Sequence, residues 1–454
     1  MKVKFVGNYV ILCWAVVGLA IIWWQKQSVA NGYSFSTNST VLDAGFLRVP
    51  RLFQEVKELG KSTNFENTYS QSLSSAKSAI NPQIVAANTR FSLKLFSHLQ
   101  TKQANQNLFI SPASVSVALA IAYNGSNGET RQAIGRTLEL QQISIQDVNE
   151  ANALLKKHLL ESSFKSQLCI ANSLWIDRQE TIKPDFNQKI KQYYQAEIKS
   201  IDFRQNHASV TINDWVKKST NGKIDTIIER IEPNTTFLLL NAIYFAGSWK
   251  YPFAKNLTQD YPFTLANGTQ KSVKMMFQQI PGIKYYENEL FQAINLPYAD
   301  NRLSMYIFLP NKSLGLRGFY QNLSHENWQK WMGKFNSNEL DNDYSQLISV
   351  GLPRFKLEYE TDLVDTLKAL GMQIAFSQNA DFSAMTVPPL WIDKVQHKTF
   401  VEVNEEGTTA AAVTTMGGTR GGGMQIIVDR PFFCVIGDNL TGTILFMGSI
   451  ADPQ

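Results

Sequence analysis

Cysteine and histidine are scarce in this chain, with 3 and 5 residues respectively among 454. So few cysteines exclude a scaffold held together by several disulfides. Cys169 and Cys434 lie in apolar, strand-like runs, so we expect both to be buried free thiols, although the sequence leaves a disulfide between them open. The histidines show neither HExxH nor any other metal-ligand spacing, and we therefore predict no metal site.

Recognisable enzyme motifs are missing as well. The chain has no G-x-S-x-G nucleophile elbow, and its C-terminal glycines lack the following GK[ST] of a phosphate-binding loop. The net charge of +5 is small, and no basic stripe interleaved with aromatic residues occurs. We therefore expect a protein that is not an enzyme, carries no cofactor and binds no nucleic acid. Its 44% hydrophobic and 18% charged residues are those of an ordinary globular protein.

Residues 1–30 are typical of a targeting segment. Two lysines precede an apolar run from Phe5 to Trp24. Ser28 and Ala30 suit a signal peptidase, but the run is long for a signal peptide and ends in two tryptophans, as at a membrane interface. A cleaved signal peptide and an uncleaved membrane anchor both remain open. Either one predicts that the rest of the chain lies outside the cytoplasm, secreted or held at the membrane surface.

Residues 31–85 are rich in serine, asparagine and threonine and show no sustained periodicity. We predict a disordered tether here and a folded domain over residues 86–454. Within that domain, Ser111 can cap a helix that begins at Pro112, because proline at the first helical position needs no donor. Further on, Asn241 stands alone in a long apolar strand-like run, and a buried asparagine needs hydrogen-bond partners.

Proline is absent between Gly407 and Arg430. Small residues fill the first part of this stretch, from Thr408 to Thr415. Since proline would remove a donor from a β-ladder, a run without it can enter the middle of a sheet, where small side chains fit on both faces. The alternative is a flexible linker. Strand-like runs over Gln425–Ile436 and Thr443–Ile450 follow, and they favour the strand.

These motifs together resemble the serpin family of serine protease inhibitors. The sequence NEEGTTAAAVT, from Asn404, matches the small-residue hinge of the family's reactive-centre loop, and DRPFFCVI, from Asp429, matches its C-terminal signature. The resemblance extends over roughly residues 86–452. It implies an α+β fold with three β-sheets, eight to nine helices and an exposed reactive-centre loop, in a protein that acts as a monomer.

The resemblance also implies which residues act. Those of the loop hinge are Glu405, Glu406, Gly407, Thr408, Thr409, Ala410, Ala411, Ala412, Val413 and Thr414. Those matching the cluster that controls opening of the main sheet are Ser111, Ser114, Asn241 and His397, with Trp249 where the loop first enters the sheet. Val413, where alanine is commoner in the family, is a mild departure.

The implied activity is suicide-substrate trapping of a serine protease. The protease cuts the loop, forms an acyl-enzyme with it, and is carried away when the cut segment inserts into the main sheet. Counting forward from Gly407 places Gly421 before the scissile bond, whereas counting back from Pro431 places Arg420 there. We prefer the bond between Arg420 and Gly421, because arginine fits the acidic pocket of a trypsin-like enzyme.

Several alternatives remain at this stage. Subtilisin-like or elastase-like proteases are the other target classes. A non-inhibitory serpin, acting as a chaperone or carrier, is a different function, but it would be favoured by bulky, charged or proline residues in the hinge, and this hinge has none. The targeting segment and tether, taken alone, also suggest a surface-tethered binding module.

Overall fold

The structure is a computed structural model that describes residues 81–161, 166–337, 347–387, 390–407 and 424–453. All of them fall within one compact unit. The predicted targeting segment, residues 1–30, and nearly all of the predicted tether lie outside the described residues. In the part of the chain that the structure covers, no helix has the length and apolarity needed to cross a membrane.

The strands of the described residues form three β-sheets, as the family resemblance predicts. The five-stranded sheet, called the main sheet below, has the order β11 (Phe355–Asp362), β12 (Lys394–Val403), β4 (Phe237–Gly247), β2 (Ser166–Asp177) and β3 (Glu197–Ile201). The six-stranded sheet has the order β1 (Leu108–Ile110), β15 (Ile444–Ile450), β14 (Phe432–Asp438), β9 (Leu303–Pro310), β8 (Phe291–Pro297) and β7 (Tyr285–Glu287). The four-stranded sheet has the order β13 (Gln425–Ile427), β10 (Leu347–Pro353), β6 (Gln270–Pro281) and β5 (Gln259–Thr264).

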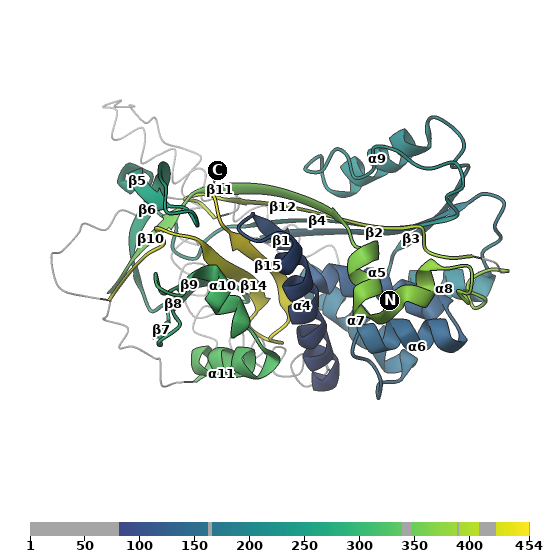
Figure 1. Ribbon diagram of the computed structural model, residues 1–454, viewed down its shortest axis with the longest axis horizontal. Coiled ribbons are helices and arrows are strands. Elements are labelled where there is room, and N and C mark those ends of the chain that lie inside the picture. Colours follow the sequence, from purple (N-terminus) through teal and green to yellow (C-terminus); the bar gives the residue numbers. More distant parts are fainter. Residues whose placement is uncertain (1–80, 162–165, 338–346, 388–389, 408–423, 454) are drawn as a thin grey trace, which may run out of the picture. The chain divides into compact units, whose positions relative to one another are not determined.

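Nine α-helices occur among the described residues, which agrees with the predicted eight to nine. They are α4 (Pro82–Lys102), α5 (Pro112–Gly125), α6 (Gly128–Thr137), α7 (Ile145–Glu161), α8 (Pro184–Tyr193), α9 (Ala208–Ser219), α10 (Gly315–Gln321), α11 (His325–Asn336) and α12 (Val364–Leu367). Figure 1 shows α9 on one side of the main sheet and helices α5 to α8 on the other. The α9 side is called the outer face below, and the opposite side the inner face.

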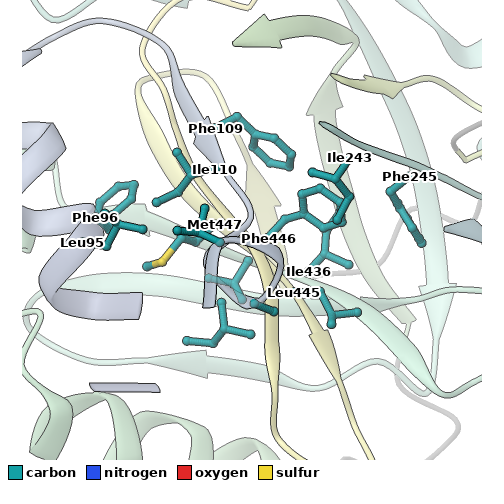
Figure 2. Close-up of a cluster of buried hydrophobic side chains, with 14 of the residues drawn as sticks. Leu95, Phe96, Phe109, Ile110, Ile243, Phe245, Ile436, Leu445, Phe446 and Met447 are labelled. Carbon is teal, nitrogen blue, oxygen red and sulfur yellow. The ribbon is translucent and has the colours of Figure 1, made fainter. Parts of the chain in front are cut away.

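The central strand β4 is buried along its whole length, which explains why its sequence is almost continuously apolar. Its outward side chains join α9 in one hydrophobic cluster, and its inward side chains belong to the large core of the protein. Figure 2 shows part of that core, where Ile243 and Phe245 of β4 lie near side chains of β1 and β15. An inward polar side chain on β4 is therefore fully cut off from water.

Helix α5 begins as its sequence predicts. The Ser111 side chain accepts a hydrogen bond from the backbone N–H of Ser114 at 3.4 Å, and Pro112 occupies the first turn. Ser114 and Ser116 are buried on this helix, which is apolar on nearly every side. The cap therefore fixes the point where the chain leaves β1 and passes beneath the main sheet.

Helix α9, on the outer face of the main sheet, ends at Ser219, because Asn221 and Gly222 adopt left-handed backbone conformations. Asn213 remains important, since its Oδ1 accepts hydrogen bonds from the backbone N–H groups of the irregular segment that follows, at 2.9 Å for Ile227 and 3.2 Å for Ile228.

The strand-like run Gln425–Ile436 proves to be two strands in different sheets. Strand β13 is a three-residue edge strand that runs parallel to β10, while β14 pairs with β9 and β15. Pro431 separates the two strands, and its missing N–H prevents one continuous ladder. The backbone N–H of Ser349 donates to the carbonyl of Met424 at 2.9 Å, which adds one hydrogen bond just before β13.

The two described cysteines are free thiols. Cys434 is buried in β14, as predicted, and burial raises its pKa. Cys169 is only half-buried, because it faces the edge of the outer cluster, where the Asn221 amide lies 3.3 Å from its sulfur. The prediction of burial is therefore wrong for Cys169.

Candidate functional site

The site begins with a parallel pair of strands at the centre of the main sheet. Strands β12 and β4 pair from Lys394 with Leu238 to Val401 with Phe245, and we call this pair the seam. On either side of it, β12 pairs with β11 and β4 pairs with β2 in antiparallel ladders. Parallel pairing is slightly less stable per residue than antiparallel pairing. The seam is therefore the weak line through the middle of the main sheet.

Four of the five predicted sheet-opening residues form one buried hydrogen-bonded cluster on the inner face of the seam. Nδ1 of His397 lies 2.5 Å from Oδ1 of Asn241, and the backbone N–H of Ser111 donates to His397 Nε2 at 3.1 Å. Asn241 Nδ2 donates to the hydroxyl oxygen of Ser114. Because Nε2 accepts, the imidazole proton sits on Nδ1 and bonds across the seam.

A residue that the sequence reasoning missed completes this cluster. The Nδ2 group of Asn241 also donates to Oδ1 of Asn172, the registered partner of Asn241 on β2. The signal was present, since Asn172 is a polar residue inside an apolar strand-like run, just as Asn241 is. Together these contacts tie three neighbouring strands and helix α5 to one another.

The environment of His397 keeps its ring neutral. The side chain is fully buried, and burial lowers its pKa to about 3. The hydrogen bond with Asn241 raises the pKa, but by less than burial lowers it. A protonated ring would also lose the bond from the Ser111 N–H, because Nε2 could no longer accept. The cluster therefore holds the seam only while His397 is uncharged.

A tight turn at Asn404–Gly407 ends the chain's passage up β12. The backbone N–H of Asn404 donates to the Gly407 carbonyl at 3.0 Å, and the reverse bond is 3.2 Å long. Gly407 has φ of 115°, and a Cβ placed there would lie 2.2 Å from the Gly247 carbonyl oxygen and 2.5 Å from the Trp249 nitrogen. Only glycine fits, so the start of the predicted hinge is pressed against the end of β4.

Trp249 supports this turn from the end of β4, where sequence matching places it. Its indole N–H donates to the Asn404 carbonyl at 3.0 Å, and its backbone N–H donates to the Glu406 carbonyl at 3.1 Å. Its ring stacks on Tyr298 with centroids 4.7 Å apart. Trp249 therefore lies apart from the polar cluster and holds the mouth of the seam.

Glu405 anchors the start of the hinge through an ion pair. Its carboxylate, 3% exposed, accepts hydrogen bonds from the Arg354 guanidinium, one of them 2.8 Å from Nε, and from the Thr258 hydroxyl. Burial raises the pKa of this carboxyl, but the bonds from Arg354 and Thr258 outweigh it and the pKa is lowered. Sequence gave no signal for either partner, because both lie far from Glu405 in the chain.

The rest of the predicted loop lies outside the described residues. This concerns the remaining hinge residues, Thr408 to Thr414, and the predicted bond between Arg420 and Gly421. Their roles stay predictions. The structure describes the two ends of this segment, at Gly407 beside the seam and at Met424 beside β10.

Comparison with known proteins agrees with this geometry. A family model described as serpin (serine protease inhibitor) matches residues 86–453. The leukocyte elastase inhibitor of Sus scrofa is 37% identical over 386 residues, covering 82% of this chain and 100% of the relative. Plasminogen activator inhibitor 2 of Homo sapiens is 32% identical, covering 82% and 99%. The crystal structure of a thermophilic serpin, tengpin, in the native state superposes with a TM-score of 0.74 at 31% identity, covering 82% of this chain and 95% of tengpin.

Proposed function

Because the chain belongs to the serpin family and is a protease inhibitor rather than an enzyme, we propose that it traps serine proteases by inserting its cleaved loop into the seam. One observation carries this proposal. The turn at Asn404–Gly407 reverses the chain at the mouth of a parallel strand pair, with Gly407 bridged to Ser248 just beyond β4. A segment that continues down the seam from Gly407 runs antiparallel to both β12 and β4.

The energetics of such an insertion are favourable. The less stable parallel ladder is replaced by two antiparallel ladders. Each additional ladder hydrogen bond contributes roughly 1 kcal/mol net. The segment from Thr408 to Thr415 is made of small residues without proline, so it meets the requirement for a central strand. The uncut protein is then a kinetically trapped state above a more stable one.

Cleavage and trapping are linked by a race between two rates. The protease serine attacks the carbonyl of Arg420, the amine of Gly421 leaves, and an ester joins the protease to the new end of the loop. Insertion then carries the ester away from the loop's original position, while hydrolysis of the ester would release an intact protease. Fast insertion yields a covalent complex, and slow insertion yields only a cleaved inhibitor.

The proposed targets are trypsin-like proteases. Arg420 supports this class, because its guanidinium can form a bidentate, charge-assisted contact with a carboxylate in the specificity pocket. The relatives named as inhibitors of leukocyte elastase and of plasminogen activator support serine proteases more broadly, so elastase-like and subtilisin-like enzymes are the alternative targets. We place this activity outside the cytoplasm, supported by the apolar segment of residues 1–30 and the tether that follows.

Incubation with trypsin tests the proposal. The full chain should form a complex that survives denaturing electrophoresis, and mass spectrometry of the released peptide should find Gly421 at its N-terminus. Arg420→Ala should keep the thermal midpoint of the parent and form no complex with trypsin. Complete cleavage without any covalent complex would exclude the trapping mechanism, while a released peptide that begins at Gly422 would move the bond by one residue.

A further inference from the structure

An aromatic pair crosses the seam on its outer face. Tyr244 of β4 and Phe400 of β12 are registered partners, and their ring centroids lie 5.6 Å apart at an interplanar angle of 48°. Both side chains belong to the outer hydrophobic cluster, and the residues are only 2% and 7% exposed. The two strands of the seam are therefore joined by a ring contact as well as by their backbone ladder.

A lysine flanks each ring from outside the seam. Nζ of Lys223, in the segment after α9, lies 5.5 Å from the centre of the Tyr244 ring. Nζ of Lys356, on β11, lies 5.3 Å from the centre of the Phe400 ring. Each lysine ammonium group is attracted electrostatically to the ring that it contacts. Each lysine also comes from the same side of the seam as its ring.

The aromatic pair and the polar cluster lie on opposite faces of the same ladder. His397 and Asn241 are registered three residues before Phe400 and Tyr244, and alternation along a strand turns them to the inner face. Separating the strands on the inner face breaks one set of hydrogen bonds. On the outer face it breaks the ring contact.

We propose that Tyr244 and Phe400 form an aromatic clasp that holds the seam closed and sets how fast it opens. The inference rests on the proposed insertion. Neighbouring strands lie about 4.8 Å apart, so an inserted strand moves β12 and β4 to about twice that spacing and separates the rings. The lysine contacts survive this movement, because Lys356 moves with Phe400 and Lys223 stays with Tyr244. The ring contact is therefore the part of the outer cluster that opening must break.

Hydrogen exchange of the full chain, followed by mass spectrometry, tests the clasp without any protease. Phe400→Leu and Tyr244→Leu should each speed exchange in peptides from β4 and β12 by about two- to tenfold, the range expected for loss of an aromatic pair. Peptides from β14 and β15 should exchange as in the parent. Since both substitutions remove the same contact, the double variant should exchange little faster than either single variant.

A control separates the clasp from general packing. Lys356→Met removes a contact that opening leaves intact, so this variant should exchange as the parent does. The clasp is refuted if the leucine variants match the parent at the seam, if they speed exchange equally in β14 and β15, or if Lys356→Met speeds exchange as much as Phe400→Leu does. Should Phe400→Leu fail to fold, Tyr244→Leu gives the same decision.

Trypsin partitioning gives a second readout, which distinguishes failure of the clasp from failure of the proposed function. If the seam opens faster, the leucine variants should convert a larger share of cleaved chain into covalent complex than the parent does. A merely structural role would lower that share. Faster exchange in a chain that forms no complex with any protease would keep the clasp and reject the trapping mechanism.

Discussion

Asn241 Oδ1 and His397 Nδ1 meet 2.5 Å apart across a parallel ladder in which the two residues are registered partners. The side-chain bond therefore joins the same two strands as the backbone ladder at that level. Because His397 also accepts from the Ser111 N–H, the bond ties helix α5 to the position of the seam. Any opening of the seam must break this bond, so changes that weaken it should act on stability and on inhibition together.

Acid should weaken the fold through His397. In the unfolded chain the ring takes up a proton below its ordinary pKa of 6.5, whereas in the folded chain it stays neutral down to about 3. The unfolded state thus binds more protons between these values, and stability falls as the pH falls through this window, by up to about 1.4 kcal/mol per pH unit. Urea unfolding midpoints at pH 7 and pH 5 measure this effect. The unfolding midpoint of His397→Gln should fall less between pH 7 and pH 5 than that of the parent. Equal falls in both proteins would show that His397 does not cause the loss of stability in acid.

Asn241→Ala should destabilise the protein by about 3 kcal/mol, because it leaves a buried imidazole N–H, the Ser114 hydroxyl and the Asn172 carbonyl oxygen without their shared partner. The free energy of unfolding in urea measures the loss. Asn152→Ala is a matched control, since that buried asparagine donates to the Val148 carbonyl of its own helix and hydrogen-bonds the Tyr194 hydroxyl, outside the cluster. A similar loss in both variants would mean that the cluster contributes no more to stability than any buried asparagine does.

Gly407→Ala should disrupt the turn at the mouth of the seam. The added Cβ would meet backbone atoms on the β4 side, and φ of 115° is unfavourable for alanine. We expect a fall in thermal midpoint of several degrees. Gly268→Ala measures the cost of a left-handed backbone without any steric clash, because that glycine has φ of 84° but nothing within 4 Å of a new Cβ. Equal falls would show that the close approach is unimportant.

Arg354→Met should leave the Glu405 carboxylate buried with only the Thr258 hydroxyl as a side-chain partner. Since Arg354 is 44% exposed, we expect a loss of about 1–3 kcal/mol rather than that of a fully buried pair. Adding Glu405→Gln should recover part of the loss, which a double-mutant cycle of unfolding free energies measures. Lys255→Met, at the more exposed pair with Glu406, should change stability by less than about 1 kcal/mol.

Thr408→Arg should turn the inhibitor into a substrate. Insertion would bury an unpaired guanidinium at a cost of several kcal/mol, so hydrolysis of the acyl-enzyme should overtake insertion. Gel densitometry of covalent complex against cleaved chain measures the partition. Thr408→Val, which has a similar shape and no charge, should still form the complex. If the arginine variant inhibits as well as the parent, insertion does not begin at this residue.

Local chemistry predicted part of the site, and the family resemblance supplied the rest, including the roles of Ser114, His397 and Trp249. Ser111 and Pro112 mark a helix start because capping depends on neighbours in sequence, and Asn241 is conspicuous because its strand is otherwise apolar. Partners that come from distant segments carried no such signal. Arg354 is an ordinary exposed arginine until the fold brings it to Glu405.

A strand-like sequence also does not tell which sheet the strand joins. An apolar run such as Gln425–Ile436 predicts extended backbone, but which sheet it joins depends on the rest of the fold. The end of α9 at Ser219 likewise depends on left-handed residues at Asn221 and Gly222, which an apolar period does not reveal.

The brevity of β13 has a consequence for how long the molecule remains usable. The segment after Gly407 is held at its far end by three ladder residues and the bond from Ser349 to Met424. If those contacts release before any protease arrives, the uncut segment gains the slack to enter the seam by itself, and the molecule is spent without a target. The working lifetime of such an inhibitor is then set by the short edge strand that follows the bait residue, and storage alone would lower the active fraction.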